Sequence, residues 1–466
     1  MANTAFDAQP DADLETILAE ITAVRATAES IRSAEDLLEH ENRVRAVGDM
    51  VQRFLMADGL TKAVSNPEVV QAGRALAKGL PRRLRSDGLQ GVSVKTARGS
   101  VVEVKTSYHR ERSRVGNKRR PGLYPALVVL GIRERCTPKL ASDVSRTVAM
   151  LGSLAEAKAE LEANGISLDV KTIRSIAYLF AARARTAQAS ETYRWGEAVT
   201  GRRVVVSLDG GRVRVRRKKR GPKTSKGRTR FHGVWEEPKL LILYVVDADG
   251  RPLRNWAPVI DGTLRGPDVT YALLLSYAQQ LEITRADRIL FVADGAPWIF
   301  SRFDTLIAEL HLERDRVHIL IDFYHAAEQL TDAVKLRRWS KKRQTRWLDR
   351  HRRLLRRGAI ADVVCALDDL RQGAGRNARK VGTHLGYFLR NYERFAYPEA
   401  HDLGFPMGSG AMESAVRRVV NLRIKGNSIF WRAENVEAIL LLRSFYKARR
   451  WADLQRMAVA REAVAS

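Results

Sequence analysis

Carboxylates at the ends of apolar stretches are the residues of this sequence whose types and spacing could do chemistry. Asp209 follows the largely apolar stretch 204–208 (Val-Val-Val-Ser-Leu), and Asp294 follows the apolar stretch 289–293. Glu413 lies at the start of a helical pattern further along the chain. Two strand-end aspartates and one helix-borne glutamate are what a two-metal phosphoryl-transfer site needs, with the ions about 3.5–4 Å apart. We therefore predict two Mg²⁺ (or Mn²⁺) ions, which carboxylate oxygens bind while leaving positions for water and phosphate.

Each of these acidic residues also has a purely structural interpretation. Asp209 and Asp294 both precede glycine, and Asp-Gly is a common turn after any strand. Glu413 could stabilise the first turn of its helix, and Glu434 competes with it as the third ligand. We favour Asp209, Asp294 and Glu413 as metal ligands, because the small residues 408–410 before Glu413 would let a DNA backbone come close.

The elements that must position these residues alternate between strands and helices. Three consecutive valines, 204–206, predict a strand that is buried on both faces. Further strands are predicted at 240–246, 288–293 and 317–321, with a turn at 247–250 and a helix at 267–282. This pattern predicts an α/β fold with a mixed sheet flanked by helices.

Several short sequences around the carboxylates occur together in one order. They are Ser207-Leu208-Asp209-Gly210, Val292-Ala293-Asp294-Gly295-Ala296-Pro297-Trp298-Ile299, Ile321-Asp322-Phe323-Tyr324-His325-Ala326, Gly408-Ser409-Gly410, Glu413-Ser414, Arg423-Ile424-Lys425-Gly426 and Trp431. In these residues the chain resembles a DDE transposase with an RNase H-like catalytic core. It is most similar to the bacterial insertion-sequence group of the Kra and Lre type, distantly allied to Mutator-like transposases. The resemblance covers the chain well from about residue 200 onward and only loosely before it.

The resemblance implies how the strands lie and what Asp322 and His325 do. In an RNase H-like sheet the Asp294 strand lies between the Asp209 strand and the strand 317–321. Asp322 would then project one strand beyond Asp294, near enough to orient a metal-bound water or the DNA. Alternatively, Asp322 caps the following helix and His325 packs against the sheet. These two interpretations are left open by the sequence.

Basic residues near the carboxylates are candidates for phosphate contacts. Eleven of the nineteen residues from Arg212 to Arg230 are Lys or Arg. A charge run is usually a solvated face, but this run starts three residues after Asp209, and we predict a flap that grips phosphate. Its candidate residues are Arg216, Arg217, Lys218 and Lys219, and those after Glu413 are Arg417, Arg423 and Lys425.

The first 200 residues read as a DNA-binding region that is mostly helical. Residues 12–57 form a helical pattern with an apolar seam from Leu14 to Ile31, which either packs on its own domain or forms a dimerising coiled coil. Asp58-Gly59 is the predicted stop. Residues 89–108 predict a hairpin that turns at Gly99. Many relatives carry a zinc ribbon near the basic loop 109–120, but this loop has no cysteine, so we expect no zinc there.

A helix-turn-helix is predicted between residues 137 and 187. Gly152 and Asn164-Gly165 interrupt the helical pattern, and Ser167 is the expected N-cap of the last helix. Lys171 and Arg174 would lie on that helix and face DNA. An ordinary helical connector fits the pattern as well.

The segment from Asp322 to about residue 400 is helical in pattern and rich in Lys and Arg. We interpret it as an insertion that separates the second and third acidic residues. Trp339 and Trp347 lie eight positions apart within it. Tryptophans at helical spacing are more often core residues than platforms for nucleobases, although the basic setting favours the second use more than usual.

The amino-acid composition indicates which partners and which cellular compartment to expect. The net charge of +28 over 466 residues implies a polyanionic partner, nucleic acid before a membrane surface. Two cysteines, Cys136 and Cys365, exclude a disulfide framework. The longest strongly apolar run is too short for a membrane span, and the acidic N-terminus does not resemble a signal peptide. We expect a cytoplasmic, nucleoid-associated protein without membrane contact.

Together these observations predict a transposase of a bacterial insertion sequence that binds the element ends, cleaves DNA and transfers the strand to target DNA, as a homodimer or higher oligomer. Two alternatives are a nuclease of the same fold without strand transfer and a non-catalytic DNA-binding protein derived from a transposase. Six regions are predicted: 1–75 helical, 76–135 β-rich and basic, 136–198 helix-turn-helix-like, 199–325 first part of the core, 326–404 helical insertion, and 405–466 C-terminal helices of the core.

Overall fold

A computed structural model of the chain describes residues 13–81, 83–111, 114–115, 118–119, 122–189, 195–225, 227–426 and 429–460. The chain divides into two units, and each is described by itself. Unit 1 comprises Met1–Tyr193 and Gln455–Ser466, and unit 2 comprises Arg194–Leu454. This division is coarser than the six predicted regions, which therefore stay a prediction. No helix in the described ranges is both long and apolar enough to cross a bilayer.

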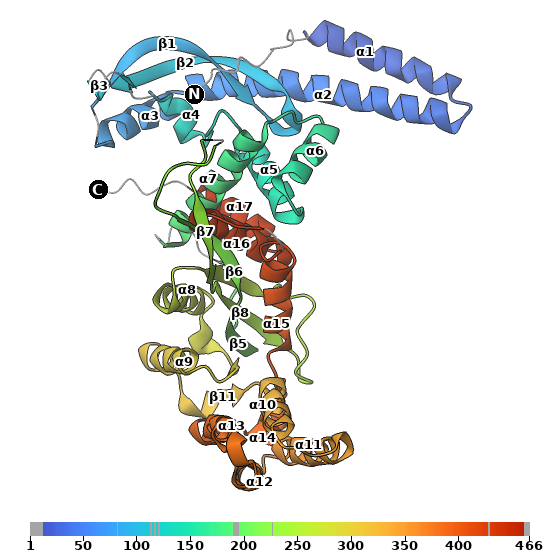
Figure 1. Ribbon diagram of the computed structural model, residues 1–466. Coiled ribbons are helices and arrows are strands. Elements are labelled where there is room, and N and C mark those ends of the chain that lie inside the picture. Colours follow the sequence, from blue (N-terminus) through green and yellow to red (C-terminus); the bar gives the residue numbers. More distant parts are fainter. Residues whose placement is uncertain are drawn as a thin grey trace. The chain divides into compact units, whose positions relative to one another are not determined.

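Unit 1 is mostly helical and contains one long hairpin (Figure 1). Its elements are α1 (Leu14–Thr27), α2 (Ala34–Ser65), α3 (Pro67–Gly79), β1 (Leu84–Lys95), β2 (Val101–Glu111), β3 (Arg114–Val115), β4 (Lys118–Arg119), α4 (Pro125–Val129), α5 (Pro138–Met150), α6 (Leu154–Ala163) and α7 (Val170–Ala189). The predicted hairpin is confirmed: β1 and β2 pair antiparallel, Val92 lies opposite Val104, and Gly99 in the turn has a φ of +85°. Residues 112–113, 116–117 and 120 of the basic loop 109–120 lie outside the described residues.

Two N-terminal expectations need correction or refinement. α1 packs on α2 and buries Ile17 of the apolar seam, which is the first of the two alternatives for that seam. The predicted stop at Asp58-Gly59 is wrong, because α2 continues to Ser65. A glycine inside a helix costs only about 1 kcal/mol, whereas Pro67 cannot continue the ladder of hydrogen bonds and instead opens α3.

The helices α5, α6 and α7 follow the predicted pattern of breaks. α6 ends at Ala163 and α7 begins at Val170, so a short turn joins them. The predicted N-cap is wrong: Asp169, and not Ser167, accepts the backbone hydrogen bonds of Lys171 (2.8 Å) and Thr172 (2.9 Å). The carboxylate is preferred at this end because it also opposes the positive pole of the helix.

Unit 2 is built on a five-stranded mixed sheet of order β9-β8-β5-β10-β11. The strands of this sheet are β5 (Arg203–Gly210), β8 (Lys239–Val246), β9 (Val259–Thr263), β10 (Arg288–Ala293) and β11 (Val317–Ile321), and unit 2 also contains β6 (Val213–Lys218) and β7 (Phe231–Glu236). β8 runs antiparallel to β5 and β9, and β10 runs parallel to β5 and β11. The expected neighbours of the Asp294 strand are confirmed, since β10 lies between β5 and β11.

Helices cover this sheet and continue beyond it. They are α8 (Pro267–Gln280), α9 (Pro297–Glu309), α10 (Phe323–Lys335), α11 (Lys341–Arg356), α12 (Ile360–Gln372), α13 (Ala378–Arg390), α14 (Tyr397–Asp402), α15 (Gly410–Val416), α16 (Ala433–Lys447) and α17 (Trp451–Val459), which crosses into unit 1. Figure 1 shows α8 and α9 on one side of the sheet and α15 on the other. The valines 204–206 are at most 1% exposed, as predicted for a strand covered on both faces.

The basic run after Asp209 forms a hairpin. β6 and β7 pair antiparallel in a sheet of their own, and the segment at Trp431 adds a bridge to Val215 of β6. We call the hairpin 213–236 the arm. The arm side of β6 that carries Val213 and Val215 is buried, whereas all of β7 except Glu236 is exposed.

The segment between β11 and α15 is helical, as the sequence predicts. Its tryptophans are not core residues, however, so the favoured interpretation of the pair is wrong. Trp339 and Trp347 are half-buried. Trp339 lies beside the guanidinium of Arg343, 4.1 Å from the ring centroid, and Trp347 stacks on His351 at 4.0 Å. Cationic and aromatic neighbours on α11 take the place that a hydrophobic core would fill.

Candidate active site

Three aspartates lie in one row across neighbouring parallel strands. Ser207 of β5 is in register with Val292 of β10, and Ala293 of β10 is in register with Ile321 of β11. Continuing both registers places Asp209 opposite Asp294, and Asp294 opposite Asp322. Because neighbouring strands lie about 4.8 Å apart and alternate residues point to the same side, the three carboxylates share one edge of the sheet.

Asp209 is a half-buried carboxylate with the carboxylates of Asp294 and Glu237 and the imidazole of His325 nearby. Its Oδ1 accepts a hydrogen bond from the Gly210 backbone N–H at 2.6 Å. Burial, assisted by the negative charges of Asp294 and Glu237, raises the pKa of Asp209 to about 6. Glu237 occupies the space where a Cβ on Gly210 would lie. This glycine therefore admits a carboxylate of the same chain.

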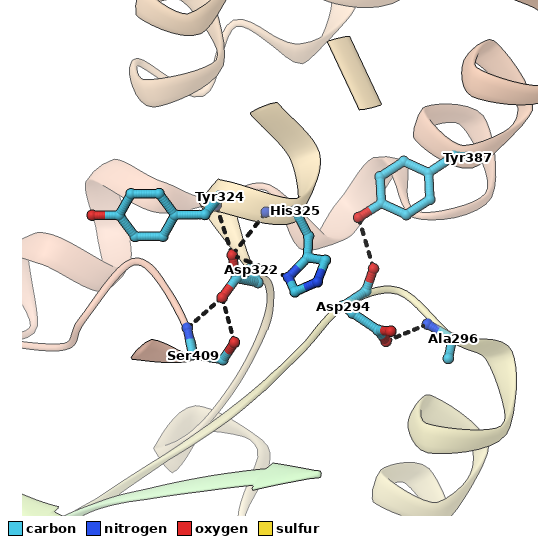
Figure 2. Close-up of polar contacts among 7 residues, drawn as sticks. All are labelled: Asp294, Ala296, Asp322, Tyr324, His325, Tyr387 and Ser409. Carbon is cyan, nitrogen blue, oxygen red and sulfur yellow. Dashed lines mark hydrogen bonds and ion pairs between the residues drawn. The ribbon is translucent and has the colours of Figure 1, made fainter. Parts of the chain in front are cut away.

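Asp294 is fixed by contacts on both sides of its loop. Its Oδ1 accepts a hydrogen bond from Ala296 N–H at 2.9 Å, and its carbonyl accepts one from the Tyr387 hydroxyl at 2.9 Å (Figure 2). Gly295 has a φ of +99°, and a Cβ there would lie 2.5 Å from the Tyr387 ring. Tyr387 belongs to α13, so the helical segment between β11 and α15 positions the second aspartate.

Asp322 is fully buried and is used by the protein itself. Its Oδ1 accepts hydrogen bonds from the backbone N–H groups of Tyr324 (2.6 Å) and His325 (2.9 Å), and its Oδ2 accepts two from Ser409. Burial acts to raise its pKa, but the nearby His325 side chain, together with the hydrogen bonds from Ser409 and from the His325 backbone, outweighs burial and holds the pKa at about 2. Four donors fill the acceptor positions of a carboxylate. The capping role is therefore confirmed, and Asp322 has little capacity left for a metal ion.

His325 lies between Asp322 and Asp294 (Figure 2). Its Nδ1 is 3.6 Å from Oδ1 of Asp322, an ion-pair distance that is too long for a hydrogen bond. Asp322, assisted by Asp294, raises the pKa of His325 to about 9. The imidazole is thus a cation at neutral pH, placed within the field of the acidic row, and the alternative of simple packing against the sheet does not describe it fully.

Glu413 comes to the row from α15, which packs on β5 and β8. Ligand atoms of Glu413, His325 and Asp322 lie within 4.8 Å of one another, and Glu413 is the exposed member of the three. Asp209 and Asp294 do not belong to that group. The smallness of residue 408 has a local reason: a Cβ on Gly408 would lie 2.9 Å from the Tyr324 ring, whereas Gly410 faces open space.

The donor set fits a divalent cation with a preference for oxygen. Asp209, Asp294 and Glu413 offer carboxylates, which Mg²⁺ and Mn²⁺ prefer. Asp209 and Asp294 repel each other, which adds to the larger effect of burial in raising the pKa of Asp209. A bound cation would offset this repulsion. Because four donors already occupy Asp322, the predicted metal ligands stay Asp209, Asp294 and Glu413.

The predicted phosphate contacts have different surroundings. Lys218, Lys219, Arg417 and Lys425 are exposed, as are Lys171 and Arg174 on α7 of unit 1. Arg217 pairs with Glu236, and Arg216 donates to the Phe430 carbonyl at 3.0 Å. Arg423 is only 6% exposed and its guanidinium lies over Trp431. A phosphate contact by Arg423 would require it to leave this position.

Sequence reasoning did not find Glu237, Tyr387 or the pair Lys239 and Trp298. The Lys239 ammonium lies 4.2 Å from the centroid of the Trp298 ring and 3.2 Å from Oε1 of Glu237. Trp298 belongs to the stretch that follows Asp294, and its closeness to Asp294 in sequence is the local feature that could have indicated a place near the site. Tyr387 had none, because nothing in its local sequence indicates which loop its hydroxyl reaches.

The chain matches no protein-family model and no curated protein. Among solved structures, the Drosophila P element transposase in its strand transfer complex aligns with 68% of this chain and 93% of its own, at 10% identity and a TM-score of 0.31.

Proposed function

We propose that this protein is a transposase-like enzyme that cleaves DNA phosphodiesters with two divalent metal ions on an RNase H-like core. The observation that carries the proposal is the row formed by Asp209, Asp294 and Asp322, with Glu413 and His325 facing it. The fold assignment is supported by the strand order β9-β8-β5-β10-β11, with β10 and β11 parallel to β5.

Each residue of the site has a separate task in this proposal. Asp209, Asp294 and Glu413 would hold Mg²⁺ or Mn²⁺, which when bound activates the attacking oxygen and stabilises the leaving oxygen. Asp322 fixes the start of α10 and the residues before α15, and so sets the position of His325 and Glu413. His325 carries a positive charge that can attract the scissile phosphate.

DNA is the proposed substrate because the chain is strongly basic and exposed Lys and Arg side chains adjoin the site. Lys425 lines the same cleft as Asp209 and Arg212, and Lys218 and Lys219 extend from it along the arm. Such contacts hold the phosphate backbone without reading sequence. Lys171 and Arg174 on α7 are proposed to contact the element ends, and assembly as a homodimer or larger oligomer on DNA stays a prediction.

The experiment that tests the function uses supercoiled plasmid and labelled duplexes with Mg²⁺ or Mn²⁺. Nicking or cutting that requires the metal supports a phosphodiesterase, and joining of the new 3′-OH to a second DNA supports a transposase. Cleavage without joining favours the nuclease alternative. Tight DNA binding with no cleavage under any metal favours the non-catalytic alternative and would refute the proposal.

A further inference from the structure

One face of the arm combines exposed aromatic rings with guanidinium groups. Trp235 lies opposite Arg214 and Phe231 lies opposite Lys218 in the register of the two strands. The side chains of Trp235 and Phe231 are 53% and 41% exposed. Phe430 covers Gly233 between them, and a Cβ on Gly233 would lie 2.4 Å from its ring. We call this surface the arm face.

Cations alternate with the rings along the arm face. The guanidinium of Arg214 lies 5.2 Å from the centroid of Trp235 and 4.9 Å from that of Phe430, and the guanidinium of Arg216 lies 4.6 Å from that of Phe231. Arg214 also donates to the Gly426 carbonyl at 2.7 Å. Because these guanidinium groups are anchored to backbone carbonyls, the rings are held in place before any ligand arrives.

The arm face begins at the candidate active site. Trp235 lines one cleft together with Asp209, Glu237 and Lys425. From there β7 leads back to Phe231, which lies opposite the exposed Lys218, and the exposed Lys219 lies one position further along the arm. Trp235 and Phe231 are four residues apart on one strand, a separation of about 13 Å. A ligand that contacts both rings therefore extends over several nucleotides.

This combination of groups fits unpaired DNA better than a duplex. A duplex presents phosphates outside and keeps its bases stacked inside, so basic side chains alone suffice to bind it. An unpaired strand exposes flat bases that stack on aromatic rings while cations meet the backbone. We propose that the arm face binds an unpaired strand of the DNA substrate beside the cleavage site. The inference rests on the proposed function, because it assigns the state of the DNA at that site.

Binding of short fluorescent DNAs in EDTA tests the inference without any need for cleavage. The probes are a single strand of about 12 nucleotides, the matching duplex, and that duplex with an unpaired tail. The variants are Trp235→Ala, Phe231→Ala and Trp235→Phe, which keeps a ring. Tyr392→Ala is the control, because Tyr392 is an aromatic residue of unit 2 with a similar exposure of 43%.

Trp235→Ala should weaken binding of the single strand and the tailed duplex by roughly 5- to 150-fold, the equivalent of about 1–3 kcal/mol for one stacked base. The blunt duplex should lose less than about threefold, since its phosphate contacts remain. Trp235→Phe should retain most of the single-strand affinity, and Tyr392→Ala all of it. A thermal midpoint equal to that of the unmodified protein shows that the variant is folded.

Equal losses on all three DNAs, or no loss on any, would overturn the inference. Its failure is distinguishable from failure of the proposed function, because cleavage is measured separately on the blunt duplex. If the protein cleaves DNA with metal but its DNA binding does not depend on the rings, the inference about the arm face is refuted and the proposed function stands. If binding of single strands depends on the rings but no metal supports cleavage, the inference about the arm face is supported and the proposed enzymatic function is refuted.

Discussion

Ser409 donates two hydrogen bonds to one oxygen of Asp322, from its backbone N–H and from its hydroxyl, each at 2.5 Å. The residue before α15 is thereby tied to the residue before α10. Since α15 carries Glu413 and α10 carries His325, this contact sets the distance between two members of the site that are far apart in sequence.

Asp322→Ala should destabilise the protein by about 2–4 kcal/mol. The substitution removes a helix N-cap and leaves buried backbone donors without an acceptor. Urea unfolding measures the loss. Asp322→Asn should cost less, because one amide oxygen can still cap α10, and Ser409→Ala should cost about 1 kcal/mol. An unchanged midpoint for Asp322→Ala would show that the carboxylate does not hold these segments together.

Asp209→Asn, Asp294→Asn and Glu413→Gln should each abolish metal-dependent cleavage while DNA affinity in EDTA changes little. Each substitution removes a charged oxygen ligand and keeps the size of the side chain. Glu434→Gln is the matched control: Glu434 is an exposed glutamate in the first turn of α16, 3.9 Å from Arg432. Normal cleavage by one of the three variants would exclude that residue from the metal site.

Asp209→Asn should stabilise the metal-free protein at pH 7.5 by about 1–2 kcal/mol. The folded pKa of Asp209 is raised to about 6 from 3.8, so the free energy of unfolding falls as pH rises through this range and stays lower above it. The asparagine amide of the variant is neutral, so the variant does not lose stability in this way. Adding Mg²⁺ should raise the melting temperature of the unmodified protein and leave that of the variant nearly unchanged. An equal Mg²⁺ response in both proteins would contradict a role for Asp209 in metal binding.

The stability of the metal-free protein should decline between pH 6.5 and pH 9 through His325. Its folded pKa is raised from 6.5 to about 9, so the stabilisation by the imidazolium is complete below pH 6.5 and lost as pH rises through 9. After allowance for solvent screening, the contribution is about 1–2 kcal/mol. His325→Gln should show a shallower decline over the same window in urea unfolding at several pH values. Parallel curves for the two proteins would refute the ion pair with Asp322.

Replacing Lys218, Lys219 and Arg220 by Gln should flatten the dependence of log K on log salt for duplex DNA. The expected change is about 0.9 per lost phosphate contact. All three side chains are exposed on the arm or at its tip. The same replacement of Arg376, Arg379 and Lys380, exposed at the start of α13, is the control and should leave the slope unchanged. Equal slopes for the arm variant and the unmodified protein would show that these basic residues do not contact phosphate and are simply solvated.

The sequence by itself determined several strands of the sheet and the aspartates at which two of them end. The spacing of apolar residues and the β-branched residues predicted the strand at 204–208 and the hairpin that turns at Gly99, because these signals depend only on neighbouring residues. The aspartates 209 and 294 were identifiable for the same reason, since each directly follows a buried strand. Local signals also misled: Asp58-Gly59 resembles a stop, yet α2 continues, because packing outweighs the modest cost of one glycine.

Only the tertiary structure decided what the candidate site residues do. Asp322 and Asp294 look alike in sequence, but Ser409, far along the chain, occupies one oxygen of Asp322 and leaves it no room for a metal. Tyr387 reaches the Asp294 loop from α13, and Glu237 fills the space beside Gly210. Trp235 is exposed in the cleft that Asp209 also lines, although the two are 26 positions apart in sequence. Contacts of this kind join residues that are distant in sequence, and no local pattern encodes them.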